Sequence, residues 1–288
     1  MPSTSVPLSG GPLFAKAMDW IKLARLPNAV TAGVGVWLGH ACLPGPFAFK
    51  AAVLGSVAMA VLAAAGNMQN DVLDLQVDRI NRPDRPLPSG RIAPGIARGA
   101  ALALYLAAIL LASALGGPEG SLTAGMVLLL CLYNLKLKTL PLWGNMAVAV
   151  LCALAIYLPE LGRFPDFTAI PVLFAFLTTL AREVAKDAED VAGDRASGYL
   201  TLPIRFGEGA AKGVTAAACV LVLLLLPLPW LRLGYHAGYP ILAAFGPLPL
   251  LAIILVALKR PVTDWHGVQK RLKWTMLAGM LAILAGVL

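Results

Sequence analysis

The sequence predicts an all-α membrane protein, a bundle of nine transmembrane helices, and three observations lead to this fold class. First, 59% of the 288 residues are hydrophobic, 13% are charged and the mean hydropathy is +0.78, whereas a soluble domain carries about 25% charged residues. Second, the apolar residues form runs of about the 17–25 residues that a helix needs to cross the hydrocarbon layer. Third, Lys and Arg are distributed unevenly between alternate loops. This composition excludes disordered, coiled-coil, collagen-like and disulfide-stapled chains.

Nine apolar segments are of spanning length or nearly so, the fourth being the shortest. Gly35 and Gly39 in the first segment predict close packing against another helix. Residues 1–15 are uncharged and rich in Pro, Ser and Gly, so they are expected to form a disordered tail before a single domain over 16–288. The nine expected spans are residues 27–43, 51–69, 96–115, 121–135, 142–159, 168–185, 211–231, 239–258 and 272–288.

The basic residues orient this bundle. With nine spans, only Lys50, Arg163 and Arg232 of the 23 Lys and Arg residues fall on one side of the membrane. Because cytoplasmic loops collect Lys and Arg, the N-terminus is expected in the cytoplasm and the C-terminus outside. The net charge of +8 therefore reflects topology and does not indicate nucleic-acid binding. The four Cys and three His residues are isolated, which argues against a site built from His or Cys.

The acidic residues are concentrated in two short windows, which together hold nine of the 15 Asp and Glu residues. Both windows contain the pattern D-x-x-D-x-x-x-D and follow the second and the sixth expected span. The pattern suggests a weak internal repeat. The two triplets are Asp71, Asp74 and Asp78, and Asp187, Asp190 and Asp194.

The spacing of these acids predicts two stripes of oxygen ligands. At 100° per residue, a continuous helix would place Glu183, Asp187, Asp190 and Asp194 within an arc of about 60°, with Glu189 pointing elsewhere. The polar residues Asn67, Asn70, Asp71, Asp74 and Asp78 would spread over an arc of about 100°. Like charges at this spacing repel each other, and a divalent cation would relieve that repulsion. Oxygen ligands without His or Cys favour Mg²⁺. Solvated helix ends paired with nearby Arg and Lys are the alternative.

Cationic side chains next to both windows would complement bound phosphate. Arg79, Arg82 and Arg85 follow the first window, and Arg182 and Lys186 belong to the second. Lys136 and Lys138 end the fourth expected span. Simple topology-setting charge is the competing interpretation.

At these residues the sequence resembles the UbiA superfamily of intramembrane prenyltransferases over nearly its whole length. The resemblance rests on N-D-x-x-D-x-x-x-D at 70–78 after the second expected span and on the second aspartate motif after the sixth. The stretches 81–91, 182–190 and 201–204 are most similar to the branch that transfers a prenyl chain to a glycerol-phosphate lipid. The resemblance implies an active-site cavity that faces the cytoplasm.

The resemblance also implies roles for individual residues. The catalytic set comprises four carboxylates and one aromatic ring that would face a developing allylic cation, namely Asp74, Asp78, Asp190, Asp194 and Tyr133. The implied Mg²⁺ ligands are Asn70, Asp71, Asp74, Asp78, Asp187, Asp190 and Asp194. The implied substrate-binding residues are Arg25, Asn28, Arg79, Arg82, Lys136, Lys138, Arg182 and Lys186.

The expected activity is Mg²⁺-dependent transfer of a prenyl group, geranylgeranyl by resemblance, from its diphosphate to the free hydroxyl of geranylgeranylglyceryl phosphate. Two alternatives stay open: transfer to an aromatic acceptor such as 4-hydroxybenzoate, and a cation transporter that uses the carboxylates as an ion path. Transporters place their ion ligands near the bilayer midplane. The two stripes predicted here lie instead at the ends of their spans, next to Arg-rich loops. The expected partners are a prenyl diphosphate, a lipid acceptor and membrane lipids, without nucleic acid or an obligate protein partner.

Overall fold

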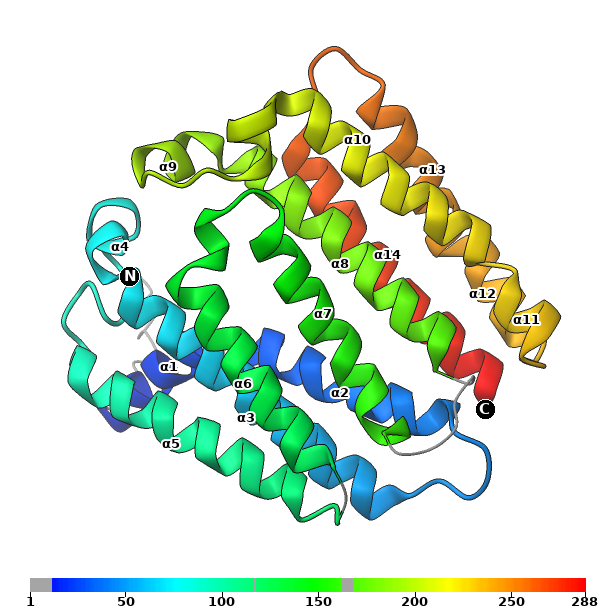
Figure 1. Ribbon diagram of the computed structural model, residues 1–288, viewed down its shortest axis with the longest axis horizontal. Coiled ribbons are helices and arrows are strands. Elements are labelled where there is room, and N and C mark those ends of the chain that lie inside the picture. Colours follow the sequence, from blue (N-terminus) through cyan, green and yellow to red (C-terminus); the bar gives the residue numbers. More distant parts are fainter. Residues whose placement is uncertain (1–11, 117, 162–167) are drawn as a thin grey trace, which may run out of the picture.

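The computed structural model describes residues 12–116, 118–161 and 168–288, and within them it contains helices and no strands. Helices suit this sequence because backbone polar groups must be satisfied internally where lipid surrounds the chain. The long helices run side by side in a bundle (Figure 1). The N-terminal half contains α2 (Leu26–Cys42), α3 (Phe49–Leu73), α5 (Pro94–Ser113), α6 (Glu119–Leu135) and α7 (Trp143–Tyr157).

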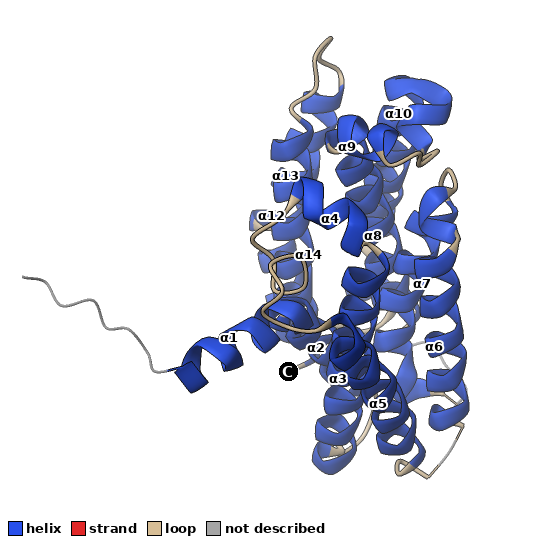
Figure 2. Cartoon of the chain, turned by 90° about the vertical axis from the view of Figure 1, so that its left-hand side faces the viewer, coloured by secondary structure: helices blue, strands red, loops and turns tan. Residues whose placement is uncertain are grey.

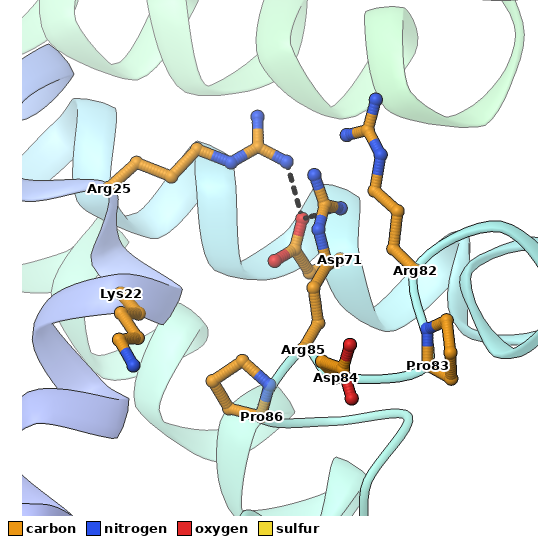
Figure 3. A pocket seen from close by; sticks show the side chains of 8 residues that line it. All are labelled: Lys22, Arg25, Asp71, Arg82, Pro83, Asp84, Arg85 and Pro86. Atoms are coloured by element: carbon orange, nitrogen blue, oxygen red, sulfur yellow. Dashed lines mark hydrogen bonds and ion pairs between the residues drawn. The ribbon is translucent and has the colours of Figure 1, made fainter.

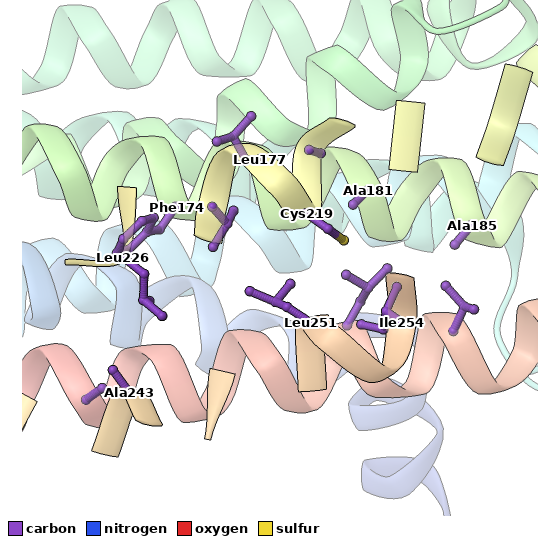
Figure 4. Packing of buried hydrophobic residues seen from close by; sticks show 14 of the residues in the cluster. Phe174, Leu177, Ala181, Ala185, Cys219, Leu226, Ala243, Leu251 and Ile254 are labelled. Carbon is purple, nitrogen blue, oxygen red and sulfur yellow. The ribbon is translucent and has the colours of Figure 1, made fainter. Parts of the chain in front are cut away.

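The C-terminal half forms the larger of the hydrophobic clusters. Phe174 and Leu177 pack there with Cys219, Leu251 and Ile254, which are buried on neighbouring helices (Figure 4). In the N-terminal half, by contrast, Met59, Leu62, Tyr105 and Met126 belong to a separate cluster. The helices of the C-terminal half are α8 (Ala169–Glu189), α10 (Leu202–Leu225), which bends at Gly207, α12 (Gly238–Phe245), α13 (Pro247–Leu258) and α14 (Trp265–Val287).

The two halves meet where α2 packs against α14 and where α7 packs against α8, and within the N-terminal half α2 also packs against α7. Gly39 on α2 makes the approach to α7 possible, since a Cβ at this position would lie 2.1 Å from the Ile156 carbonyl oxygen. Gly35 faces Ala155 and Ile156 of the same segment. The close packing expected from the two glycines is therefore confirmed, and the partner is the seventh helix.

Each of the nine expected spans coincides with helix in the described part of the chain. Five segments are long and apolar enough to cross a membrane by length and composition, and α6 is a shorter apolar helix. The expected span 239–258 is two helices, α12 and α13, because the chain breaks at Gly246 before Pro247. The five segments are Phe49–Leu73, Pro94–Ser113, Trp143–Glu160, Leu202–Arg232 and Gly238–Leu258.

Short helices lie outside the long ones. Helix α1 (Pro12–Ala24) precedes the bundle, so residues 12–15 of the expected tail are helical, while residues 1–11 lie outside the described residues, as does Arg163. Helices α4 (Leu75–Asn81) and α9 (Val191–Ala196) carry the last aspartate of each window, at the same end of the bundle (Figures 1 and 2). The remaining short elements are η1 (Leu137–Thr139), η2 (Leu158–Glu160) and α11 (Leu228–Arg232).

Candidate functional site

The two aspartate motifs have the same backbone shape. A long helix ends one residue before the middle aspartate, and a short helix begins one residue after it. The dihedral angles of the middle residues agree closely, with φ −88° and ψ 8° at Asp74 and φ −92° and ψ 10° at Asp190. The internal repeat inferred from the sequence is thus present in the backbone. The expectation of a continuous helix face through each motif is wrong beyond Leu73 and Glu189, because Asp78 lies on α4 and Asp194 on α9.

The first motif is neutralised by cations from the chain itself. Asp71 is buried and accepts a hydrogen bond from Arg25 at 2.5 Å and a longer one from Arg85 at 3.4 Å. Arg85 also donates to Asp78 at 2.6 Å. One guanidinium therefore joins the first and the last aspartate across the break between α3 and α4. Charged pairs of this kind are stronger than neutral hydrogen bonds.

Asp74 joins this motif to two other segments. Its carboxylate pairs with the Lys138 ammonium of η1 and accepts a hydrogen bond from the Tyr199 hydroxyl at 3.3 Å. The Lys138 ammonium lies 6.0 Å from the centre of the Tyr199 ring. The backbone next to Tyr199 is attached to η1 as well, because the Leu200 amide donates to the Thr139 carbonyl at 2.9 Å.

Arg25 adopts a strained backbone conformation, with φ 49° and ψ 55° in the left-handed region. Such a conformation costs about 1–3 kcal/mol in a residue other than glycine. It separates α1 from α2 and brings the guanidinium to Asp71 and, at 3.4 Å, to Asn70. The strain is therefore maintained at a position where the side chain contacts the first motif.

The second motif has no direct cationic partner among the described residues, although Lys186 acts on Asp194 from a longer distance. Asp187 accepts a hydrogen bond from the neutral Asn145 amide at 2.8 Å. Among the described residues, no Lys or Arg nitrogen lies within 4.0 Å of the carboxylates of Asp187, Asp190 or Asp194. Burial and the neighbouring Asp190 carboxylate raise the pKa of Asp194 to about 6. Negative charge is thus crowded at the second motif.

Two tyrosines lie near the motifs. Tyr133 is on α6 next to Asn134, whose side-chain oxygen accepts a hydrogen bond from the Asn70 amide of the first motif at 3.2 Å. Tyr199 follows the second motif by five residues and donates to Asp74 of the first, and burial together with Asp74 raises the pKa of Tyr199 to about 12. The Tyr199–Asp74 hydrogen bond therefore brings the two motif segments next to each other.

A cavity of about 650 Å³ opens beside the first motif (Figure 3). In this cavity the Arg25 and Arg85 guanidinium groups converge on Asp71, and Arg82 extends from the loop after α4. Four cationic side chains against two carboxylates give the lining a positive balance, which suits a phosphate group. The lining residues are Lys22, Arg25, Asp71, Arg82, Pro83, Asp84, Arg85 and Pro86.

The other residues expected to bind substrate divide into two groups. Arg182 and Lys186 stay within the second window, where they contact Glu183 at 2.6 Å and 3.9 Å. The remaining residues, Asn28, Arg79 and Lys136, are exposed. Arg79 donates to Gln76, and none of the three has a contact with a motif carboxylate among the described residues.

Three contributors to the site were not assigned from the sequence. Arg85 stood among several arginines after the first motif and was given no individual role. Asn145 and Tyr199 are separated from their partners Asp187 and Asp74 by 42 and 125 residues. Only the packing of α7 against α8, and of the segment after α9 against η1, brings these pairs together.

The chemistry of the donors fits a hard divalent cation, since the motifs offer carboxylate and amide oxygens. The described residues contain no group of three His, Cys, Asp or Glu side chains positioned to hold a metal ion. In the first motif the carboxylates are occupied by Arg25, Arg85 and Lys138. In the second, the described Lys and Arg side chains make no ion pair with the crowded carboxylates, although the charge of Lys186 acts on Asp194, and a metal ion would neutralise the remaining negative charge.

Comparison with known proteins identifies the family. The chain is 38% identical over 273 residues to the digeranylgeranylglyceryl phosphate synthase of Methanopyrus kandleri, covering 93% of this chain and 99% of the relative. It is 35% identical to the enzyme of the same name from Methanothermobacter thermautotrophicus, covering 93% and 95% of the two chains.

Solved structures share the fold. One, from work on digeranylgeranylglyceryl phosphate synthase in membranes, has a TM-score of 0.78 at 28% identity and covers 95% of this chain and 99% of its own. A UbiA homologue from Archaeoglobus fulgidus bound to GPP and Mg²⁺ has a TM-score of 0.72 at 18% identity and covers 93% and 99%.

The family model for the UbiA prenyltransferase family matches residues 28–286, which include both aspartate motifs and all the long helices but the start of α2 and the last residue of α14. The chain is a multi-pass membrane protein and belongs to the UbiA prenyltransferase family.

Proposed function

We propose that this protein transfers a geranylgeranyl group from its diphosphate to the free hydroxyl of geranylgeranylglyceryl phosphate. The observation that carries the proposal is the pair of aspartate motifs that face each other beside a cationic cavity. The names of the relatives at 35–38% identity over 93% of the chain support the glycerol-phosphate acceptor. The aromatic acceptor has no such support, and the prenyltransferase family is unlike a cation transporter.

We assign the diphosphate to the region between the motifs. Asp187, Asp190 and Asp194 would hold Mg²⁺ from one side, and the first-motif residues Asn70, Asp71, Asp74 and Asp78 would supply oxygens from the other. When bound, Mg²⁺ would neutralise the diphosphate as a leaving group. The Arg85 and Lys138 side chains, which now contact aspartates, lie where they would donate to phosphate oxygens.

The acceptor phosphate fits the cationic cavity. Lys22, Arg25 and Arg82 line it next to Asp71, so an anionic headgroup bound there would lie beside the first motif. This arrangement brings the hydroxyl of the glycerol close to the diphosphate while leaving the prenyl tails to the membrane. Holding both reactants in one geometry lowers the entropic part of the barrier.

The reaction exchanges one carbon–oxygen bond for another. The bond between C1 of the prenyl chain and the diphosphate oxygen breaks, and C1 gains allylic cation character as the electron pair leaves with the diphosphate. The acceptor oxygen forms the new bond to C1, and its proton passes to a motif carboxylate or to the departing diphosphate. The Tyr133 ring, next to Asn134 and its contact with Asn70, would stabilise the developing cation.

The topology that we propose has nine spans, with the N-terminus and both motifs on the cytoplasmic side and the C-terminus outside. Helices α2, α6, α8 and α14 would complete the five clearly apolar segments. Helices α8 and α14 are less apolar than the five segments because their turns at the motif end of the bundle contain charged residues such as Lys186 and Lys270. The asymmetry of Lys and Arg supports this orientation of the active-site cavity.

Product analysis tests the proposal. Purified protein with Mg²⁺ and labelled geranylgeranyl diphosphate would be offered geranylgeranylglyceryl phosphate and 4-hydroxybenzoate in parallel. The expected result is label in a doubly prenylated glycerol phosphate. Label in the aromatic product alone would overturn the acceptor assignment and keep the donor site. Absence of transfer to the glycerol phosphate, from protein that retains its fold, would contradict the proposal.

A further inference from the structure

Helix α1 projects sideways from the bundle (Figure 2). Its direction changes abruptly at Arg25, whose left-handed backbone conformation separates α1 from α2. The helix ends next to the cationic cavity, which Lys22 of its last turn helps to line. Its position therefore bears on how a lipid substrate reaches that cavity.

One face of α1 is held against the protein. Asp19 is buried, and both of its carboxylate oxygens accept a hydrogen bond from Arg91 Nε at 3.0 Å. Arg91 also donates to the backbone carbonyl of Asp84, in the loop that lines the cavity. Leu23 is fully buried in a cluster with Leu87 and other apolar residues. These contacts fix the rotation of α1 about its own axis.

The opposite face is apolar and exposed. Leu13 is 82% exposed, Phe14 61% and Ile21 40%. At 100° per residue these side chains, with Ala17 between them, occupy an arc of about 100°. Lys16 and Lys22 are exposed on either side of this arc. No described part of the chain covers the face, which has the apolar arc and basic flanks of a helix that lies in a membrane interface.

The neighbouring outer surface of the bundle indicates that lipid covers the apolar face of α1. On the next helix, Leu26, Val30 and Val34 are exposed at intervals of four residues, which forms an apolar stripe along the outside of the bundle. Only residues 22–25 separate the exposed face of α1 from this stripe in the chain. Basic residues on the flanks complement anionic headgroups.

We propose that α1 is an interfacial helix whose Leu13–Phe14–Ile21 face lies in the headgroup layer, its partner being the anionic bilayer surface at the end of the bundle that carries the aspartate motifs. The Asp19–Arg91 pair then ties the membrane surface to the loop around the cavity. The consequence, which rests on the proposed function, is that the acceptor phosphate reaches Lys22 and Arg25 at headgroup depth.

Fluorescence quenching by lipid tests the proposal without substrate or turnover, so its outcome is independent of the proposed function. A bimane label would be placed at residue 14, 21 or 15 in protein whose four native cysteines, Cys42, Cys131, Cys152 and Cys219, are replaced by alanine. Ala15 is the matched control because it is exposed on the side away from the apolar arc. The labelled proteins would be compared in nanodiscs with and without brominated phosphatidylcholine.

The expected result is strong quenching at residues 14 and 21 and little at residue 15, with a larger difference when phosphatidylglycerol is included. Lys16→Glu is expected to remove that gain. Loss of quenching at all three positions would overturn the proposal, because α1 would then lie in water. Equal quenching at all three would contradict the assigned face. Energy transfer between labels at residue 14 of two copies in one nanodisc would show that a second copy covers this face, which would also overturn it.

Discussion

The two aspartate motifs share a backbone and differ in their electrostatic environment. Each consists of a long helix, a break at the middle aspartate and a short helix with almost the same dihedral angles. The first motif is paired with Arg25, Arg85 and Lys138. The second has a neutral amide, Asn145, as the hydrogen-bond partner of Asp187. The same backbone shape therefore carries two motifs, of which the first is paired with cations and the second, among the described residues, is not.

This difference suggests a division of labour in the proposed reaction. A divalent cation gains most where the carboxylates lack a directly paired cation, which is the second motif. At the first motif, a bound phosphate could take the place of the aspartates as the partner of the Arg25 and Arg85 guanidinium groups, which are already in position. The predictions below test this division, from the largest expected effect to the smallest.

Removal of Mg²⁺ is expected to have the largest effect. EDTA should reduce prenyl transfer to background, because no metal ion would then neutralise the charge of the leaving diphosphate. Added Mg²⁺ should restore the transfer. Transfer measured with labelled donor checks this. Full activity in EDTA would show that the cationic side chains alone suffice as the electrostatic partner of the leaving group.

Substitution of a middle aspartate comes next. Asp190→Asn and Asp74→Asn should each lower turnover by about 10²–10³-fold, the range seen when one group that stabilises a transition state is lost. Membrane insertion and thermal unfolding, measured in parallel, should stay close to those of the unsubstituted protein. Near-normal turnover in either variant would contradict a site shared by both motifs.

Arg85→Ala should lower activity by about 10- to 100-fold, since Arg85 makes charged hydrogen bonds worth about 1.5–3 kcal/mol each. The effect should appear in both KM for the diphosphate and turnover. The control is Arg79→Ala, which removes an exposed arginine that contacts only Gln76 among the described residues. Equal losses in both variants would mean that general positive charge, rather than the Arg85 contacts, accounts for the effect.

Tyr199→Phe should lower activity by about fivefold, because it removes one hydrogen bond to Asp74 worth about 1 kcal/mol and keeps the ring beside Lys138. Tyr199→Ala should be more harmful. The Mg²⁺ concentration for half-maximal activity should rise in both. If it is unchanged while thermal stability falls, Tyr199 serves the fold and does not position the first motif.

The smallest effect is expected at Glu189, whose carboxylate contacts His266 at 2.8 Å and Gln269 at 3.0 Å and points away from the motifs. Glu189→Gln should change turnover by no more than about twofold, as for most exposed substitutions. Steady-state kinetics beside Asp190→Asn makes the comparison. A loss as large as that of its neighbour would mean that the whole window, irrespective of side-chain direction, contributes to the site.

Much of this organisation follows from the sequence, and the reasons for the exceptions are physical. Apolar runs located the long helices, and the acid spacing located both motifs and the direction of Glu189. The breaks at Asp74 and Asp190 were missed because helical periodicity assumes an uninterrupted helix. Tyr199 and Asn145 depend on contacts between distant segments, which no local pattern encodes.

The most direct test of the division between the motifs is Mn²⁺ binding, followed by electron paramagnetic resonance in the absence of diphosphate. Mn²⁺ prefers the same oxygen ligands as Mg²⁺. We expect Asp190→Asn and Asp194→Asn to lose most of the bound Mn²⁺, and Asp71→Asn, whose carboxylate is already paired with Arg25, to retain it. Retained binding in the second-motif variants, or equal loss from both motifs, would contradict the account.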